Sequence, residues 1–321
     1  MTKREKKKKK NLILIIILVL ILGVGAFVTY QVINDKKGND DNKVLVPEKK
    51  PEPVKKLQIV DEDSTSRPYA VMINNINVAR PLQSGLQDAY IVYEIIVEGG
   101  ITRYMALFMD QDTTRIGSIR SARHYFIDYA LENDAFYVHH GQSTQALSDF
   151  KKFPIDRIVV DNNVTGWRDR SLRVSSEHTL FTNIDKLEKG IKKRRTTRKG
   201  NLLLNYSIDE IDLSKNDDAI VANNVNINYS YSSKTGYTYD PEKKVYLRTV
   251  NGKAHKDYVT KEQYTVKNII TYKVKNYTLN DPEKKGRQGL NNIGKGEGYY
   301  ISNGYAVPIT WEKKSRSSKT I

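Results

Sequence analysis

The chain has 321 residues, of which 39% are hydrophobic and 28% charged, and its formal net charge is +16. This length and mixture predict one or two globular domains besides any tail. Cysteine is absent. That absence excludes disulfides, thiolate metal sites, thiol nucleophiles and a lipid-bearing cysteine.

The N-terminus has the pattern of a membrane-inserting segment. Residues 1–11 carry seven Lys or Arg and one Glu, and no polar side chain occurs from Leu12 to Val28. The positive-inside rule predicts a cytoplasmic tail over residues 1–11 and a transmembrane anchor over residues 12–30, with the remainder outside the cell. A signal peptide cleaved after Ala26 is the alternative.

This location decides which partners the basic charge favours. Outside the cell, an excess of Lys and Arg attracts anionic lipid head groups and wall polymers rather than nucleic acid. The predicted partners are the membrane, through the N-terminal helix, and an anionic wall polymer, a lipid phosphate or another envelope protein. The predicted location is the cell membrane, with a single span and extracytoplasmic C-terminal domains.

Composition divides the remainder of the chain into three parts. Residues 31–66 are rich in Lys, Asp, Glu and Pro, which predicts a disordered spacer. Residues 67–206 alternate strand and helix patterns and predict a mixed α/β domain. Residues 217–321 consist of short strand patterns between turn signals and predict a mostly antiparallel β domain. The predicted fold class is therefore α+β, preceded by a transmembrane helix.

Turn signals and tyrosines characterise the last part. Asn251-Gly252 and Asn303-Gly304 predict tight hairpin turns. Tyrosines recur at alternate positions, which is typical of the half-buried face of a sheet, with a carbohydrate-stacking face as the alternative. The chain ends directly after a strand-like segment that contains Trp311. Because a β domain rarely leaves its last edge uncovered, we expect a C-terminal piece to be missing.

One hairpin of the first domain carries several charges. The segment IVYEIIVEGGITRYMALFMD, residues 91–110, has two strand-like runs around Gly99-Gly100, and glycine adopts the positive φ that a primed turn requires. With the two glycines as the loop, the predicted register pairs Ile96 with Arg103. The strand period of two then places three charged residues on one face. These residues are Glu94, Glu98 and Arg103.

A helix with a polar line is predicted next. Apolar residues recur at helical spacing in GSIRSARHYFIDYALEND, and Ser118 is suited to the N-cap. Successive i,i+4 neighbours on this helix are Arg120, His124 and Asp128. Arg123 lies one position off that line. The segments AFYVHHGQS and DRIVVDN then predict two strands, the first ending in a glycine turn.

These segments resemble a known family. RPYAVMINN, ARPLQSGLQDAYIVYEIIVEGGITRYMALF, IGSIRSARHYFIDYA and VHHGQS are similar to the N-terminal domain of the YerB-like proteins. YDPEKKVYLRTVNGKAHKD and GYYISNGYAVPITWEKKSR resemble that family's β-rich C-terminal domain. The resemblance implies an exported, mostly membrane-anchored protein of Gram-positive bacteria, and it implies no reaction, because the family is a domain of unknown function. Family members are often lipoproteins, whereas this chain has no cysteine to carry a lipid.

The motifs that carry the resemblance contain the charged residues of the candidate site. The candidate binding residues are Glu94, Glu98, Arg103, Arg120, Arg123, His140 and His178. Three interpretations of this set stay open. In a purely structural one, the two glutamates pair with the hairpin arginine, while the helix arginines pair with acids such as Asp128 or Asp88, because a buried charge needs a partner.

The other two interpretations are functional. Arginines from the hairpin and the helix could face one cleft and bind an anionic group through their bidentate fork, helped by the helix dipole. Alternatively, one glutamate acts as a general acid or base while the arginines stabilise developing negative charge, as in a transferase or hydrolase acting on an anionic wall precursor or glycopolymer. We favour binding or scaffolding of an anionic ligand at the membrane–wall interface, and whether the protein is an enzyme stays open.

Other chemistries find no support in the sequence. The five histidines show no H-x-x-x-H or H-x-H spacing, so no metal site is expected. No phosphate-loop or dinucleotide-binding glycine motif occurs, so no cofactor is expected. The GQS segment lacks the G-x-S-x-G elbow of serine hydrolases.

Overall fold

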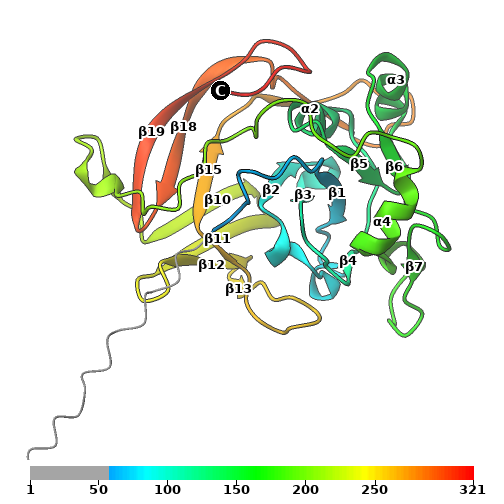
Figure 1. Cartoon of the computed structure of the whole chain (residues 1–321), viewed down its shortest axis with the longest axis horizontal. Helices are drawn as coiled ribbons and strands as arrows, with labels where there is room; N and C mark the ends of the chain where they lie inside the picture. The colour runs from blue at the N-terminus through cyan, green and yellow to red at the C-terminus, as the bar shows by residue number, and fades with distance from the viewer. Residues whose placement is uncertain (1–57) are drawn as a thin grey trace, which may run out of the picture. The chain divides into compact units, whose positions relative to one another are not determined.

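The fully buried strand β1 (Tyr69–Asn74) lies at the centre of a five-stranded sheet with the order β2-β3-β1-β5-β6 (Figure 1). The computed structural model describes residues 58–321. The other strands of this sheet are β2 (Ile91–Ile96), β3 (Thr102–Phe108), β5 (Phe136–His139) and β6 (Arg157–Val159). β1, β5 and β6 are parallel to one another, whereas β3 is antiparallel to both β1 and β2.

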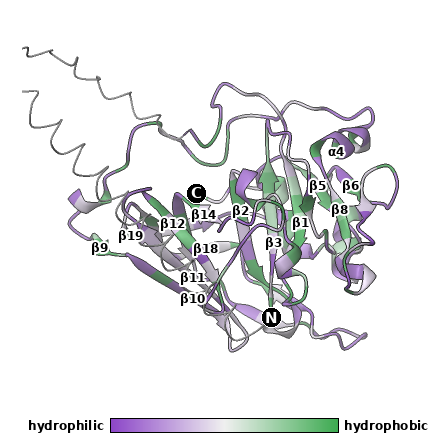
Figure 2. Ribbon diagram, turned by 90° about the horizontal axis from the view of Figure 1, so that it is seen from below, coloured by the Kyte–Doolittle hydropathy of each residue, from purple (hydrophilic) through white to green (hydrophobic). Residues whose placement is uncertain are grey.

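Both faces of this sheet are covered, which is why β1 is apolar at successive positions. The α-helices are α2 (His124–Glu132), α3 (Thr144–Lys152) and α4 (Ile184–Ile191). Val71 packs in one hydrophobic cluster with Leu187 of α4. Its neighbour Met72 points to the other face, into a cluster with Phe126 of α2 and Ala146 of α3. Figure 2 shows the hydrophobic residues concentrated along β1, β2 and β3.

Short elements complete the N-terminal half. A small sheet with the order β4-β8-β7 contributes Ile116 and Leu180 to the cluster on the α4 side. Its strands are β4 (Ile116–Gly117), β7 (Trp167–Arg168) and β8 (Leu180–Thr182). The 3-10 helices of the described residues are η1 (Arg80–Leu82), η2 (Leu86–Asp88), η3 (Glu98–Gly100), η4 (Ser176–His178) and η5 (Leu213–Lys215).

The C-terminal half is built from antiparallel strands. One sheet has the order β10-β11-β12-β13, with β14 beside β12, a second has the order β15-β18-β19-β9, and β16 pairs with β17. The strands are β9 (Ile220–Val221), β10 (Asn224–Ser230), β11 (Ser233–Asp240), β12 (Val245–Val250), β13 (Lys253–Ala254), β14 (Thr265–Val266), β15 (Asn268–Tyr272), β16 (Asn276–Thr278), β17 (Gln288–Leu290), β18 (Gly294–Ser302) and β19 (Tyr305–Lys313). Tyr246 lies in one hydrophobic cluster with Ile269 and Ile301, and Tyr237 packs against this cluster.

Both predicted Asn-Gly turns are confirmed. Asn251-Gly252 joins β12 to β13, and Asn303-Gly304 joins β18 to β19. The φ angles are 50° and 74° in the first turn and 49° and 81° in the second. Two consecutive positive φ angles are the conformation that a primed hairpin turn requires, so local chemistry alone decided these turns.

The predicted fold class is wrong. Within residues 58–321 the structure is mostly β, with 16% of residues helical. In the same part of the chain, no helix is long and apolar enough to cross a membrane. The predicted transmembrane anchor, residues 12–30, lies outside the described residues, as do the predicted tail and most of the predicted spacer.

The helix predicted from Ser118 begins only at His124. The segment before it is extended, because it pairs with strands that are distant in the sequence. Asn74 N donates to Ser118 O at 2.9 Å, and Ala122 forms a parallel bridge with Gln142. Tertiary pairing therefore overrides the helical spacing of the apolar residues, and the predicted polar line loses Arg120 from the helix.

Buried charges attach the C-terminal segment to α2. Lys313 Nζ donates to a Glu132 carboxylate oxygen at 2.7 Å, and each side chain is 1% exposed. Arg316 lies 2.7 Å from both Asp128 and Asp149. These pairs join the last strand of the chain to the helical layer of the N-terminal half.

Replacing Lys313 by Met should leave the Glu132 carboxylate buried without its cation. Removing one partner of a buried ion pair typically costs about 3–5 kcal/mol. We expect a loss of that size in the free energy of unfolding, measured by urea denaturation with circular dichroism. Lys314→Met, at the exposed next position, is the matched control and should change stability by less than about 0.5 kcal/mol. Equal losses in the two variants would contradict the role of the Lys313–Glu132 pair.

Candidate functional site

The β2–β3 hairpin differs from the predicted register by one residue. Ile95 lies opposite Arg103, and Glu94 lies opposite Tyr104. The loop is longer than two residues, because Val97 N already donates to the carbonyl of residue 101 at 2.8 Å. A shift of one residue moves a side chain to the other face of a sheet. The prediction that the three hairpin charges share one face is therefore wrong, and Glu94 and Arg103 point in opposite directions.

Glu94 belongs to a buried network that joins the two halves of the described chain. Arg248 Nη2 of β12 donates to Glu94 Oε2 at 2.6 Å, and the side chains are 8% and 9% exposed. Thr102 Oγ1 donates to Glu94 Oε1 at 2.7 Å, and Thr235 Oγ1 lies 3.0 Å from both carboxylate oxygens. Arg248 Nη2 also donates to the Tyr104 hydroxyl at 2.9 Å. Because each carboxylate oxygen has donors, Glu94 has a structural role.

A neutral histidine extends this network. His255 Nδ1 lies 2.5 Å from Arg248 Nη1 and must accept, because a guanidinium has only donors. Its Nε2 then carries the proton and donates to Gln83 Oε1. Burial lowers the pKa of His255 well below its usual value, and the charge of Arg248 lowers it further.

A second group of charges lies at the carboxyl ends of the parallel strands. We call it the arginine edge, and its members are Arg103, Arg120, Arg123 and Arg168. Arg120 N donates to Met72 O of β1 at 2.9 Å, while His140 N, just after β5, donates to Arg120 O at 3.1 Å. Arg103 Nη1 donates to Ser121 O at 2.5 Å. Arg168 Nη2 lies 3.4 Å from His140 Nε2.

The charge of Arg123 is neutralised by Glu98. Its Nε and Nη2 donate to the two carboxylate oxygens of Glu98 at 2.5 and 2.9 Å, and its Nη1 donates to Ala122 O at 2.9 Å. Desolvation alone would raise the pKa of Glu98, but the hydrogen bonds and charge of Arg123 hold that pKa below its usual value. The pair is therefore a closed bidentate salt bridge.

The remaining three arginines keep unused donors. Arg120 Nη2 donates to Glu177 Oε2 at 2.6 Å, with side chains 25% and 52% exposed. Neither Arg103 nor Arg168 forms an ion pair with any residue between 58 and 321. Glu98 and Glu177 thus neutralise two of the four guanidinium groups. Two positive charges of the arginine edge have no acidic partner in the described part.

Arg103 is the most unusual of these cations. Only 5% of the residue is exposed, and the sole hydrogen bond of its guanidinium within residues 58–321 goes to the Ser121 carbonyl. Burial lowers the pKa of Arg103 to about 9, and the charge of Arg123 adds to this effect while Glu98 opposes it. A buried cation in these surroundings is stabilised by any anion that approaches it.

Two histidines flank the same edge. His140 Nδ1 donates to Val160 O at 2.7 Å, which leaves Nε2 as the acceptor that faces Arg168. His178 Nδ1 lies 3.0 Å from Asn74 Nδ2 at the end of β1, and its Nε2 lies 3.6 Å from Glu177. Burial lowers the pKa of His178, although the charge of Glu177 opposes the change.

The structure thus separates the seven candidate residues. Six lie at or beside the arginine edge, and Glu94 does not. The pairing of helix arginines with Asp128 or Asp88 is wrong, because Asp128 binds Arg316 and Asp88 accepts from Thr113 Oγ1 at 2.7 Å. Sequence reasoning missed Arg168 and Arg248, although Arg248 lies in the YDPEKKVYLRTVNGKAHKD segment that resembles the family, because both reach their partners only through tertiary folding.

Comparisons with known proteins agree with this architecture. The fold defines a two-part, mostly β protein whose halves are joined by buried ion pairs. The chain belongs to the DUF3048 family, described as proteins of unknown function: the family's N-terminal domain matches residues 57–197 and its C-terminal domain matches residues 225–321. This membership confirms the resemblance to the YerB-like proteins.

YerB of Bacillus subtilis matches most of the chain both in sequence and in structure. A protein of Bacillus subtilis (strain 168) named "Putative lipoprotein YerB" is 29% identical over 272 residues, which span 81% of this chain and 77% of the relative. The crystal structure of the YerB protein from Bacillus subtilis is similar with a TM-score of 0.67 and 28% identity, covering 79% of this chain and 83% of that one.

Replacing Arg248 by Met should leave the buried carboxylate of Glu94 without its cation. We expect the free energy of unfolding in urea to fall by about 3–5 kcal/mol. Adding Glu94→Gln to Arg248→Met removes the uncompensated charge and should recover part of the loss. If the double variant is less stable than Arg248→Met by the full cost of Glu94→Gln alone, the two residues are not coupled.

Acid should destabilise the protein through its buried neutral histidines. Burial lowers the pKa values of His124 and His139 to about 4, whereas an unfolded histidine titrates near 6.5. The unfolded state therefore binds more protons below about pH 6.5, so stability is complete above that pH and falls as the pH decreases towards 4.

His139→Asn keeps a donor for the Gly141 carbonyl, which lies 2.8 Å from His139 Nδ1, but cannot titrate. Urea unfolding at several pH values should show a shallower loss of stability in this variant than in the wild type, by up to about 1.4 kcal/mol per pH unit. If the free energy of unfolding depends on pH in the same way in both proteins, the lowered pKa of His139 does not contribute to acid destabilisation.

Proposed function

We propose that this protein binds an anionic phosphate-type group at the arginine edge, on the extracytoplasmic side of a membrane. The observation that carries the proposal is the buried Arg103, which has no ion pair within residues 58–321. Arg168 is likewise unpaired there, and both guanidinium groups keep free donors. Planar guanidinium forks match the geometry of phosphate and carboxylate oxygens, and charge-assisted bonds of this kind are among the strongest that proteins form.

The position of the site in the sheet supports ligand binding. β1 has β3 and β2 on one side and β5 and β6 on the other, so the strand order reverses around it. In open α/β sheets, ligands commonly bind outside the carboxyl ends of parallel strands where the order reverses. This is an analogy between folds. Arg120 and His140 meet at this position, just beyond the carboxyl ends of β1 and β5.

The expected location supports an anionic partner. The name of the Bacillus subtilis relative describes a lipoprotein. This chain has no cysteine, but its uninterrupted apolar run from Leu12 to Val28 follows a basic segment and favours membrane association. Lipid phosphates and anionic polymers are the abundant anions of such an environment, and a basic surface binds them in preference to neutral groups.

The acids of the site favour binding over acid–base catalysis. A general acid or base works best with a pKa near the operating pH. Hydrogen bonding and the charge of Arg120 instead hold the pKa of Glu177 below its usual value, and Arg123 does the same for Glu98. Both carboxylates therefore stay ionised at neutral pH. They are suited to orienting arginines, not to exchanging protons with a substrate.

Titration with inorganic pyrophosphate tests the proposal. Isothermal calorimetry at low salt should detect binding, and Arg168→Gln should weaken it by roughly 10- to 100-fold, because a hydrogen bond to a charged group contributes about 1.5–3 kcal/mol. Glu177→Gln should strengthen binding, since it frees Arg120 from a competing carboxylate. Arg198→Gln is the charge-matched control, because Arg198 contacts Met109 at the opposite edge of the sheet.

A parallel titration with acetate distinguishes phosphate from carboxylate recognition. Tighter binding of pyrophosphate than of acetate supports a phosphate-type ligand. Absence of binding by pyrophosphate, or an equal loss in Arg168→Gln and Arg198→Gln, would overturn the proposal, because the first shows no site and the second only a general response to net charge.

A further inference from the structure

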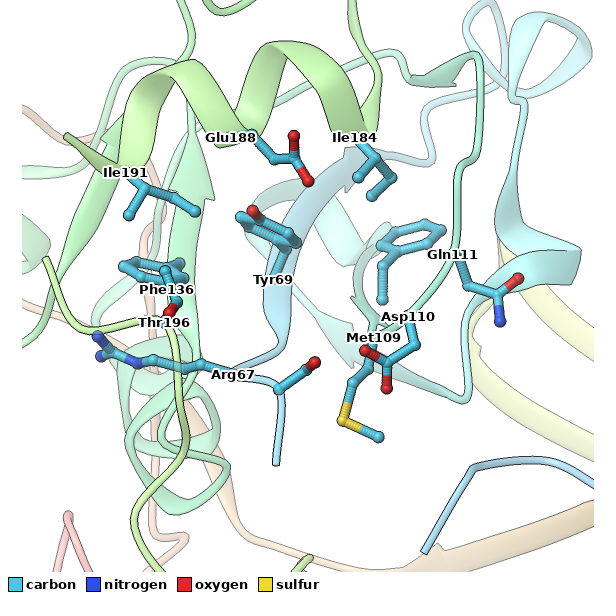
Figure 3. A pocket seen from close by; sticks show the side chains of 12 residues that line it. Arg67, Tyr69, Met109, Asp110, Gln111, Phe136, Ile184, Glu188, Ile191 and Thr196 are labelled. Atoms are coloured by element: carbon cyan, nitrogen blue, oxygen red, sulfur yellow. The ribbon is translucent and has the colours of Figure 1, made fainter. Parts of the chain in front are cut away.

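A cavity of about 190 Å³ lies at the edge of the central sheet opposite the arginine edge (Figure 3). It is bounded by the start of β1, the end of β3, the start of β5 and one side of α4. The rings of Tyr69, Phe108 and Phe136 and the side chains of Ile184 and Ile191 line it. A cavity of about 150 Å³ can hold benzene, so this one has room for a ligand of roughly that size or slightly larger.

The rim of the cavity is acidic although the chain is basic. Asp110 and Glu188 line it, and the carboxylate of neither forms a hydrogen bond or an ion pair with any residue between 58 and 321. Figure 3 shows the Glu188 carboxylate beside the Tyr69 ring, with the Asp110 carboxylate on another side of the same space. A chain with a net charge of +16 thus presents two uncompensated carboxylates around an aromatic surface.

Among the residues that line the cavity, Arg67 is the cation, and it is already neutralised. Arg67 Nη1 donates to Asp156 at 2.5 Å, and its guanidinium lies 4.2 Å from the centre of the Phe136 ring. In Figure 3 this guanidinium points away from the two rim carboxylates. Arg67 therefore forms part of the wall of the cavity and does not neutralise the carboxylates of Asp110 and Glu188.

Tyr69 supplies a polar group at the cavity. Only 9% of the residue is exposed, and its hydroxyl has no hydrogen-bond partner among residues 58–321. A ligand that bonds to this hydroxyl gains a hydrogen bond that no residue between 58 and 321 supplies. Burial raises the pKa of Tyr69 to about 12, and the charge of Glu188 adds to this effect, so the hydroxyl keeps its proton at neutral pH.

We propose that this cavity binds an organic ammonium ion. The apolar or aromatic body of the ligand packs on Tyr69 and Phe136, and its charged head lies between the carboxylates of Asp110 and Glu188. Aromatic faces attract ammonium groups, and paired acids complete the charge balance. A divalent metal ion fits poorly, because it requires about six oxygen ligands, whereas the floor here is hydrocarbon. The site is independent of the arginine edge, because its charge has the opposite sign.

Ligand-observed NMR on the full-length chain tests this site with benzylammonium and with benzyl alcohol, its neutral analogue of the same shape. Benzylammonium should bind about tenfold more tightly or better, because only it can pair with the rim. In the double variant Asp110→Asn, Glu188→Gln, the affinity for benzylammonium should fall to the affinity for benzyl alcohol. Both positions are exposed, so these substitutions should not disturb folding.

Three further variants separate this site from general effects. Tyr69→Phe should weaken benzylammonium binding several-fold, since it removes the hydroxyl and keeps the ring. Glu242→Gln, at an exposed position outside the cavity, and Arg168→Gln, at the arginine edge, should leave it unchanged. Equal affinity for the amine and the alcohol, no effect of the double variant, or no binding of either probe would overturn the proposal.

A second pair of probes identifies the source of the ammonium group. Both n-butylammonium and N-acetyl-lysine amide end in the same four-carbon ammonium chain, but the second carries a peptide backbone. If only n-butylammonium binds, the natural ligand is a free amine. If both bind equally, the site accepts the lysine side chain of a peptide. Either result supports the proposal. If none of n-butylammonium, N-acetyl-lysine amide and benzylammonium binds, the proposal is overturned.

Discussion

The buried ion pair between Glu94 and Arg248 is the interaction on which the rest of the described structure depends. Its partners are separated by 154 positions in the sequence, and it attaches β2 of the central sheet to β12 of the C-terminal half. A carboxylate buried this deeply is tolerated only when it is paired, so the two halves are energetically linked. Because the hairpin uses Glu94 for this purpose, its opposite face is left to direct Arg103 towards the strand ends.

The central sheet separates two sites of opposite charge. At the carboxyl ends of β1, β5 and β6 lie the arginines, two of them without acidic partners in the described part. At the amino end of β1 lies the cavity of Tyr69, with its acidic rim. β1 spans the distance between them and is buried throughout. An anion and an ammonium ion could therefore bind to the same sheet without competing.

Local chemistry predicted the turns but not the pairing. Gly99 and Gly100 both have positive φ, as the sequence implies, yet the loop around them includes neighbouring residues and shifts the register by one. That shift could not be predicted, since loop length depends on how Val97 packs in the core. Likewise, the helix begins at His124 and not at Ser118, because the preceding residues find strand partners far away in the chain.

By itself, the sequence determined the absence of thiol chemistry, the family, the central strands and the Asn-Gly turns, since each depends on composition or on neighbouring residues. It also identified most of the charged residues that the fold brings to the ends of the parallel strands. Only the tertiary structure decided which acid neutralises which arginine, and it brought in Arg168, Arg248 and the cavity at Tyr69. The physical reason is that electrostatic pairing and burial depend on distances in space, which a single sequence does not contain.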